Sequence, residues 1–278
     1  MSAENPHQGA DTLSLTLLGT GSSGGVPRID GDWGACDPAE PKNRRRRCGA
    51  LLERQKAGAD RPTQVLIDTA PDLREQLLDI GLKTCDGVLF THDHADQTHG
   101  IDDVRVLAYR MRQRLAAHMD ASTRASLLPK FRYCFEGEGG YPAILDLQPD
   151  LVPGTPRTLD GPGGALTVLP LRQQHGRIMS LGFRIGSLAY CNDVNELPDE
   201  TLDALGGLDT LVIDALRYTP HPSHAHVDSA LAWIQHLKPR RAVLTNLHID
   251  LDYETLKREL PAGVEPAYDG MVLSVALP

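Results

Sequence analysis

The chain has 278 residues, enough to bury a sizeable hydrophobic core in one large domain. Its composition, 41% hydrophobic and 23% charged residues, is that of a globular protein and argues against disorder. The net charge of −9 argues against sequence-independent binding to long nucleic acid, which requires a basic face. No apolar run approaches the roughly 20 residues that span a bilayer, so we expect no membrane partner.

The N-terminus and the cysteines indicate a location and a redox state. Residues 1–12 lack the apolar core of a secretion signal, so we expect a disordered tail and a cytoplasmic protein. The five cysteines include no C-x-x-C pair and are odd in number, which favours reduced, buried thiols over a disulfide framework. We expect the rest of the chain, 13–278, to form a single domain.

The first part of the chain suggests a strand followed by an anion-binding loop. Alternating apolar and hydroxylated residues predict a strand over 13–18. The glycine-rich loop 19–28, which includes Ser23, could present backbone amides to an anion, and a plain tight turn is an equally good interpretation. The arginine run 44–47 precedes a predicted strand over 48–53. It is either a solvated face, or one or two of its arginines hold a phosphate or brace a carboxylate, and for phosphate binding we choose Arg46.

The rest of the chain alternates predicted strands with helices. Apolar runs predict strands over 65–68, 88–90, 166–171, 181–191, 211–213 and 242–245. Apolar residues at helical spacing predict helices over 72–80, 102–119 and 227–237. Residues 120–164 carry glycines and prolines without strong periodicity, so we expect an insertion near the site that acts as a lid.

Potential metal ligands stand at the end of strand after strand. They are His92, His94 and Asp96 after the strand at 88–90, then His175, Asp193, and Asn246 or His248. Imidazole and carboxylate are ligands that zinc, manganese and iron accept. Because separate strands of one sheet system can bring their ends together, the pattern predicts a metal centre built from distant parts of the chain.

These motifs resemble the metallo-β-lactamase superfamily. Its His-x-His-x-Asp-His motif corresponds to residues 92–97, and its later histidine and aspartate motifs correspond to His175 and Asp193. Residues 18–27, 43–45, 99–103 and 268–270 look most similar to the PhnP-like cyclic-phosphate phosphodiesterases, neighbours of the tRNase Z type nucleases. The resemblance runs from about 13 to 275. It implies an αββα sandwich, two mixed β-sheets flanked by helices, with a metal centre at one edge.

The resemblance implies a first metal site and an altered second one. The first would consist of His92, His94, His175 and Asp193. Gln97 and Asn246 replace two histidines that the family assigns to a second metal, and amides bind zinc poorly. We therefore expect one or two divalent ions, zinc at the first site and Mn²⁺ or Mg²⁺ at a weaker site. The second set of ligands would be Asp96, Asp193 and a shifted His248.

The same resemblance assigns roles to the remaining candidates. A metal bound to three histidines lowers the pKa of water to about 7 and so provides a hydroxide nucleophile. By its spacing, Asp96 would orient that water or ligate a second ion. His226 matches the family position that contacts phosphate and acts as general acid, and His224 is a further substrate-binding candidate. For both histidines, a surface loop position is the alternative.

Three functions are compatible with the sequence. The first is a phosphodiesterase acting on a small nucleotide or cyclic phosphate, and it is favoured by the glycine-rich loop, the arginines and His226. The second is a thioester or lactam hydrolase of the same superfamily. The third is a non-catalytic nucleotide-binding metalloprotein, which the changes at Gln97 and Asn246 keep open. A homodimer is left open as well.

Overall fold

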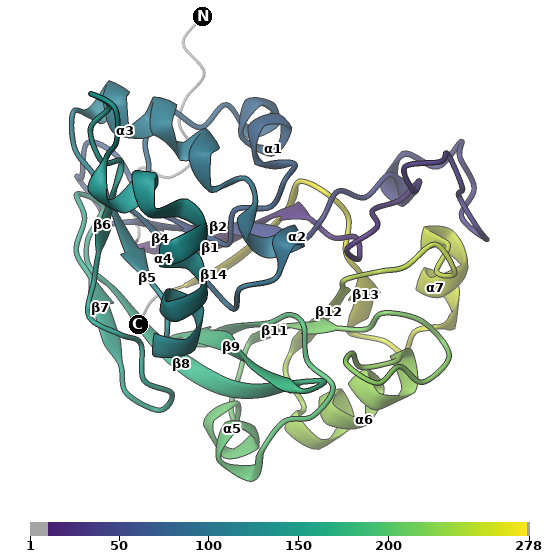
Figure 1. The fold of residues 1–278 in the computed structure, drawn as a ribbon. Helices are drawn as coiled ribbons and strands as arrows, with labels where there is room; N and C mark the ends of the chain where they lie inside the picture. Colours follow the sequence, from purple (N-terminus) through teal and green to yellow (C-terminus); the bar gives the residue numbers. More distant parts are fainter. Residues whose placement is uncertain (1–10, 277–278) are drawn as a thin grey trace, which may run out of the picture.

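Two β-sheets of seven strands each lie face to face in the computed structural model, which describes residues 11–276 (Figure 1). The strands of the first sheet are, in spatial order, β14 (Met271–Ala276), β1 (Thr12–Gly19), β2 (Gly49–Gln55), β3 (Thr63–Ile67), β4 (Gly87–Leu89), β5 (Leu115–His118) and β6 (Leu145–Leu147). The strands of the second sheet are β13 (Val264–Pro266), β12 (Arg241–Thr245), β11 (Thr210–Asp214), β10 (Leu188–Cys191), β9 (Ile178–Ile185), β8 (Leu166–His175) and β7 (Arg157–Leu159).

A hydrophobic core lies between the two sheets. β1 contributes Leu13, Leu15 and Leu17 to this core, because alternate residues of a strand face the same side. Phe183 of β9 and Tyr190 of β10 enter the core from the second sheet. The strand predicted over 13–18 is therefore confirmed, and its apolar face is the one that packs against the second sheet.

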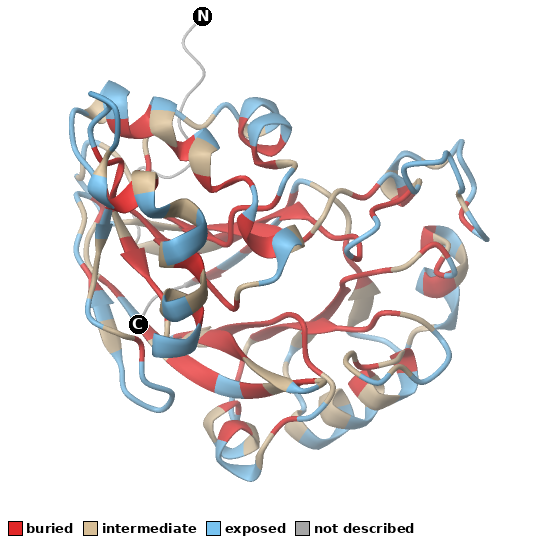
Figure 2. Ribbon diagram, in the orientation of Figure 1, coloured by how far each residue is buried: buried red, intermediate tan, exposed pale blue. Residues whose placement is uncertain are grey.

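Helices cover the outer face of each sheet. The first sheet is covered by α1 (Leu73–Ile80), the 3₁₀ helix η2 (Ile101–Val104), α3 (Arg105–Met111) and α4 (Ala121–Glu136). The second sheet is covered by α5 (Asp199–Ala204), α6 (Val227–Leu237) and α7 (Tyr253–Glu259). Figure 2 shows the buried residues concentrated in the strands between these two helical layers. The predicted αββα sandwich, with two mixed sheets, is confirmed.

The helix predicted over 102–119 is only partly present. Residues 101–111 are helical, as η2 and α3, but 115–118 form the strand β5. Arg112 ends α3 in the left-handed conformation, with a φ of 55°. Leu115 and Ala117 then enter the core beneath the helices. Pairing with β4 and β6 decides the structure of this short run, whose apolar residues fit helical spacing equally well.

Residues 120–164 are built into the sandwich and do not form a separate insertion. They contain α4, and they supply β6 and β7, which are edge strands of the two sheets. Pro129 lies inside α4 and Phe131 has non-helical backbone angles, which explains why no clear helical period is visible in the sequence. A lid role for this segment stays a prediction.

Two other boundaries differ from the sequence-based expectation. The run 181–191 forms two strands, β9 and β10, because Gly186 turns the chain with a φ of 58°. The expected N-terminal tail, 1–12, falls mostly on residues 1–10, which lie outside the described residues. Thr12 already pairs within the first sheet, opposite Gln55 of β2.

The carboxyl ends of the parallel strands meet at one edge of the sandwich. β3, β4 and β5 are parallel in the first sheet, and β10, β11 and β12 are parallel in the second. The backbone N–H of Leu181 donates to the carbonyl of Thr91 at 2.9 Å and joins the two sheets at this edge. The loops that leave these strands therefore face one another, as in other α/β proteins whose ligands bind at strand ends.

Gly100 allows two of these loops to pack closely against each other. A Cβ on Gly100 would lie 2.1 Å from the carbonyl oxygen of Ala70, so only glycine permits this close approach. The N–H of Gly100 donates to the carbonyl of Thr69, and the N–H of Thr69 donates to the carbonyl of Gln97, both at 2.8 Å. The short helix α2 (Ala95–Thr98) is thereby held against the loop that follows β3.

No helix within residues 11–276 combines the length and the apolar character needed to cross a membrane.

Asp252 joins an N-terminal loop to α7. Its carboxylate accepts hydrogen bonds from the N–H of Thr255 at 2.9 Å, from Nδ2 of Asn43 at 2.6 Å and from the N–H of Asp37 at 3.2 Å. The first bond caps α7, and the other two hold the loop that contains the 3₁₀ helix η1 (Pro41–Asn43). Partial burial opposes ionisation, but these hydrogen bonds outweigh it and lower the pKa of Asp252 to about 2.

We predict that Asp252→Ala lowers the free energy of unfolding by about 1–2 kcal/mol at pH 7, because a helix cap and two loop contacts are lost. The folded-state pKa of Asp252 lies below its ordinary value, so its contribution is complete above pH 4 and declines as the pH falls toward 2. Urea unfolding of both proteins between pH 7 and pH 3 measures this. The control is Glu254→Ala on the same helix, and equal stability of Asp252→Ala and wild type at pH 7 would contradict the prediction.

Candidate metal centre

Three imidazole rings converge at the edge where the strands end. One nitrogen of each of His92, His94 and His175 lies within 4.8 Å of the others. His92 and His94 leave the first sheet just after β4, and His175 is the last residue of β8 in the second sheet. Nδ1 of His94 and Nε2 of His175 are 3.2 Å apart. Three histidines that the sequence places up to 83 positions apart thus surround one point.

The hydrogen bond of His175 fixes which of its nitrogens can bind a metal. Its Nδ1 lies 2.7 Å from the carbonyl oxygen of Ser223, which can only accept, so Nδ1 carries the proton. Nε2 therefore presents its lone pair toward His94. Burial lowers the pKa of His175 to about 4, with the nearby His224 adding to this effect, so the ring is neutral at pH 7. A neutral imidazole is the form that coordinates metals.

A chain of hydrogen bonds orients His92 in the same way. Asp68, buried at the end of β3, accepts from the N–H and from Oγ1 of Thr91, both at 2.8 Å. Oγ1 of Thr91 in turn accepts from Nδ1 of His92 at 2.9 Å. Nε2 of His92 is buried and has no hydrogen-bond partner among residues 11–276. A buried nitrogen left without a partner is costly, so this atom fits a metal ligand.

The charge of Asp68 depends on whether a cation is bound at the three histidines. Burial raises the pKa of Asp68 to about 8, against the two hydrogen bonds from Thr91 that lower it. A cation near the three imidazoles favours the ionised carboxylate. An ionised Asp68 can only accept, which gives the chain of hydrogen bonds one direction and places the proton of His92 on Nδ1.

Asp193 supplies a buried carboxylate beside the histidines. Its Oδ1 lies 4.0 Å from Nε2 of His175 and 3.7 Å from Nδ1 of His224. Its backbone is left-handed, with a φ of 52°, and two other non-glycine residues at this edge, Asp68 and Asn246, have φ values of 64° and 63°. Such strained conformations at the ends of strands are typical of functional sites. Together with the three imidazoles, Asp193 offers the donor set of a zinc site.

His224 lies at a second cluster, together with His175 and Asp193. Its Nδ1 is 2.8 Å from Oδ2 of Asp214, the fully buried last residue of β11. Burial alone would lower the pKa of His224, but the carboxylates of Asp214 and Asp193 outweigh it and raise the pKa to about 9. His224 is therefore a cation at the side of the centre. The sequence suggested it only as a substrate-binding candidate, and the buried strand that ends in Asp214 was the available signal for its partner.

Two other predicted histidines make different contacts. His226 begins α6 and its Nδ1 contacts Oγ of Ser229. His248 lies against the guanidinium of Arg28 and 3.2 Å from Oδ1 of Asp250. Neither belongs to the two clusters of converging ligand atoms. The structure thus does not bring His248 to Asp96 and Asp193, and the place expected for it is taken by His224.

The remaining predicted residues, Asp96, Arg46 and Ser23, do not belong to the two clusters of converging ligand atoms. Asp96 lies in the first turn of α2 and accepts from Nε2 of Gln97 at 3.4 Å. Arg46 pairs with Asp269 at 3.1 Å and with Asp79 at 2.8 Å, so its charge is balanced within the protein. Ser23 is exposed on the loop.

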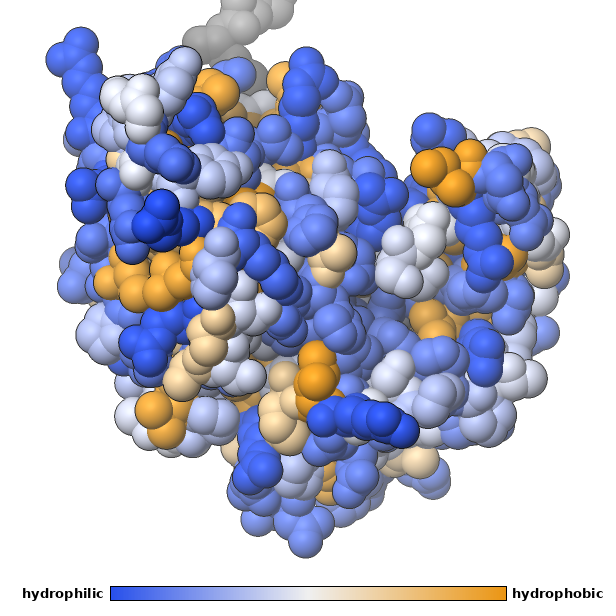
Figure 3. All heavy atoms as spheres, viewed as in Figure 1, coloured by the Kyte–Doolittle hydropathy of each residue, from blue (hydrophilic) through white to orange (hydrophobic). Residues whose placement is uncertain are grey.

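The glycine-rich loop and the arginine run line a shared cavity of about 280 Å³. Arg28 and Arg44 both line it, and neither forms an ion pair with a carboxylate within residues 11–276. The edge where the sheets meet is hollowed and hydrophilic in the space-filling view (Figure 3). A cavity lined by guanidinium groups that have no carboxylate partner is suited to an anion.

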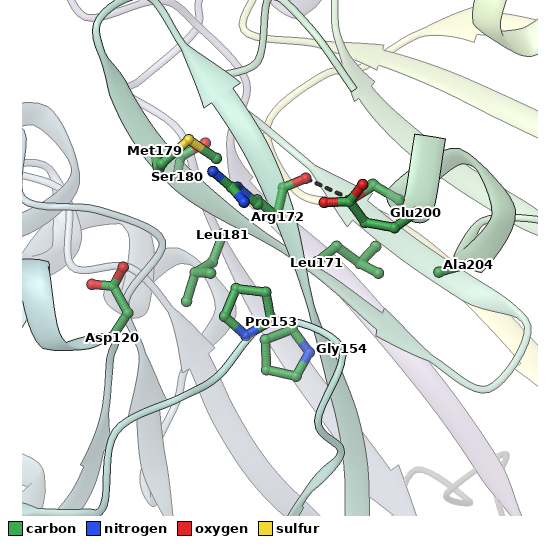
Figure 4. A pocket seen from close by; sticks show the side chains of 12 residues that line it. Asp120, Pro153, Gly154, Leu171, Arg172, Met179, Ser180, Leu181, Glu200 and Ala204 are labelled. Carbon is green, nitrogen blue, oxygen red and sulfur yellow. Dashed lines mark hydrogen bonds between the residues drawn. The ribbon is translucent and has the colours of Figure 1, made fainter. Parts of the chain in front are cut away.

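A second cavity, of about 420 Å³, lies along β8 (Figure 4), and none of the candidate metal ligands lines it. Leu171, Leu181 and Met179 give it an apolar wall, and Met179 pairs in the sheet with Gln174, the residue before His175. Arg172 lies in the same cavity and has no ion pair among the described residues. This cavity offers apolar surface together with a cationic side chain.

Comparison with known proteins identifies the family. A family profile for the beta-lactamase superfamily domain matches residues 63–249, well over half of the chain. The chain belongs to the metallo-β-lactamase superfamily. It is 35% identical to a solved structure of a new diphosphatase from the PhnP family, with a TM-score of 0.84 over 96% of this chain and 98% of that one. This match places the chain in the PhnP-like branch, as its motifs indicated.

Two other relatives differ more. The short form of human tRNase Z has a TM-score of 0.64, covering 95% of this chain and all of that one, at 17% identity, which shows a shared fold. A protein of Porphyromonas gingivalis described as an octanoyltransferase is 32% identical over 267 residues. The match covers 93% of this chain, but the chain spans only about half, 51%, of that protein.

We predict that Thr91→Val weakens zinc binding by about 10- to 100-fold, because His92 loses the acceptor that orients its ring. Valine keeps the shape of threonine, so the fold is expected to persist. Competition with a chromophoric chelator measures the affinity, and circular dichroism checks the fold. The control is Thr219→Val at an exposed position. Unchanged zinc affinity in a folded Thr91→Val protein would show that this hydrogen bond has no role in the site.

Proposed function

We propose that the protein is a metal-dependent phosphodiesterase that hydrolyses a small nucleotide or a cyclic phosphate. The observation that carries this proposal is Nε2 of His92, which is buried and has no hydrogen-bond partner among the described residues, in a group of three imidazoles whose ligand nitrogens lie within 4.8 Å of one another. When bound there, a divalent metal such as zinc activates water at neutral pH and withdraws charge from a phosphoryl oxygen.

The residues of this chain supply the other requirements of the reaction. His92, His94, His175 and Oδ1 of Asp193 hold the metal. His224 binds a phosphoryl oxygen and donates a proton to the leaving oxygen, since Asp214 holds the ring in place and keeps it protonated. We prefer His224 to His226 for this role because His224 belongs to the cluster with His175 and Asp193. The roles of Asp96 and Ser23 stay predictions.

Three observations support a phosphate substrate. Arg28 and Arg44 line a cavity with the glycine-rich loop and have no carboxylate partner among the described residues. The cavity along β8 adds Arg172 beside apolar side chains, which suits the non-reacting part of a nucleotide-sized molecule. The relative that is 35% identical is a diphosphatase of the PhnP family. A small substrate also agrees with the acidic net charge.

Thioester hydrolysis is the second candidate. It is supported by the Porphyromonas gingivalis relative, whose description as an octanoyltransferase refers to acyl chemistry. Because this chain spans about half of that protein, the acyl activity can belong to the other half. The unpaired arginines have no evident role in thioester hydrolysis, and for this reason we place it second.

The five cysteines agree with a reducing, cytoplasmic location, which we propose. All of them are buried free thiols. The homodimer stays a prediction.

We predict that the zinc- or manganese-loaded protein hydrolyses bis-para-nitrophenyl phosphate faster than an acyl thioester or a chromogenic lactam. His92→Ala is expected to lower this turnover by about 10³-fold or more, because the metal loses a ligand. His236→Ala, at an exposed position of α6, is the matched control and should keep full activity. Preferential thioester turnover would favour the second candidate, and no turnover of any substrate with either metal would contradict an enzyme function.

A further inference from the structure

The two oxygens of the Asp193 carboxylate lie in different environments. Its Oδ2 accepts from Nδ2 of Asn192 at 2.6 Å and from Nε2 of Gln97 at 3.1 Å. Its Oδ1 faces Nε2 of His175 at 4.0 Å and Nδ1 of His224 at 3.7 Å, and it receives a long contact, 3.5 Å, from Nδ2 of Asn246. Asp193 is 3% exposed, so water does not provide its partners. One oxygen is therefore free for the metal at the three histidines, and the other is saturated by amide hydrogens.

Two amide side chains make the same type of contact with the neighbouring carboxylates. Gln97 reaches Oδ2 of Asp96 at 3.4 Å in addition to Asp193. Asn246 donates to Oδ1 of Asp214 at 3.2 Å. Gln97 and Asn246 are 1% and 2% exposed. The carboxylates beside the centre, of which Asp193 and Asp214 are buried, thus find N–H donors where a second cation would otherwise be required.

An amide nitrogen has no lone pair for a metal, and these amides are not free to present their oxygens instead. A half-turn of Gln97 would bring Oε1 against the carboxylate oxygens of Asp96 and Asp193 and would lose both hydrogen bonds. A half-turn of Asn246 would lose the hydrogen bond to Asp214 and would place Oδ1 beside Nδ1 of His224, which Nδ2 contacts at 3.0 Å and which already pairs with Asp214 at 2.8 Å. The hydrogen-bond network therefore selects the orientation that excludes a cation.

His224 completes this side of the centre. Its Nδ1 lies 2.8 Å from Asp214 and 3.7 Å from Asp193, within the second cluster of potential ligands. His224 lies between the buried carboxylates of Asp193 and Asp214. It therefore occupies the position from which a second divalent ion would approach them.

We infer that the centre holds a single metal ion, and that Gln97, Asn246 and His224 take the place of a second one. This inference rests on the metal centre of the proposed function. The weaker Mn²⁺ or Mg²⁺ site that the sequence suggested on Asp96 and Asp193 is closed by amide hydrogens. In this centre Gln97 and Asn246 are positioning residues, because they hold Oδ1 of Asp193 toward the histidines.

Metal counting with matched variants tests the inference. Wild-type protein is dialysed to equilibrium against zinc, or against manganese, and the bound metal per chain is measured by mass spectrometry. We expect about one ion per wild-type chain and about two in Gln97→His/Asn246→His, which replaces both amides with imidazoles. The control, Gln113→His/Gln148→His, adds two histidines away from the centre and should keep one ion.

Two ions per wild-type chain would overturn the inference, and so would the absence of a second ion in a folded Gln97→His/Asn246→His protein. If that variant does not fold, electron paramagnetic resonance of the manganese-loaded wild type distinguishes one bound ion from two. An uncoupled Mn²⁺ signal supports a single ion, and a spin-coupled pair overturns it. A wild type that binds no metal would contradict the proposed function instead, so the two failures are distinguishable.

Discussion

The candidate site depends on hydrogen bonds that fix the protonation of imidazole rings. The carbonyl of Ser223 holds the proton of His175 on Nδ1, and Thr91 with Asp68 does the same for His92. Each bond turns the opposite nitrogen, Nε2, toward the same point. If either acceptor were lost, the ring could rotate or change tautomer, and three convergent lone pairs would no longer be available. The first and second sheets each supply one of these arrangements, so the site requires that the sandwich is assembled.

The second constraint on the site is that several carboxylates are buried at the edge of the sandwich where the strands end. Asp68, Asp193 and Asp214 are 0–3% exposed, and a buried carboxylate is stable only with partners that replace water. Each of the three accepts hydrogen bonds from neighbouring loops, and Asp214 also faces His224. The left-handed backbone of Asp68 and Asp193 is a further local cost, which the sheet pairing on either side must offset. A cation at the three histidines would offset part of this buried negative charge.

The sequence was sufficient to predict the residues whose position follows from a strand. His92, His94, His175 and Asp193 each follow or end a predicted strand, and parallel strands bring such ends together. The αββα layers were implied by the resemblance of the motifs to the metallo-β-lactamase superfamily. By contrast, β5 could not be separated from α3, because a four-residue apolar run fits both periods and only sheet pairing decides between them.

Side-chain direction within loops was the part that the sequence could not provide. His224 and His226 are two positions apart in the same loop, yet one faces Asp214 and the other contacts Ser229. His248 lies two positions beyond Asn246 and turns toward Arg28. In each case the direction depends on a partner that is distant in sequence or on the helix that begins there, and spacing carries no information about either.

X-ray absorption at the zinc edge of the loaded protein tests the central claim most directly. The account predicts a first shell of about three imidazole nitrogens and one or two oxygens at about 2.0–2.2 Å, with no neighbouring metal. A sulfur shell at about 2.3 Å, or a spectrum without the multiple scattering of imidazole, would show that the metal lies elsewhere and would contradict the proposed centre.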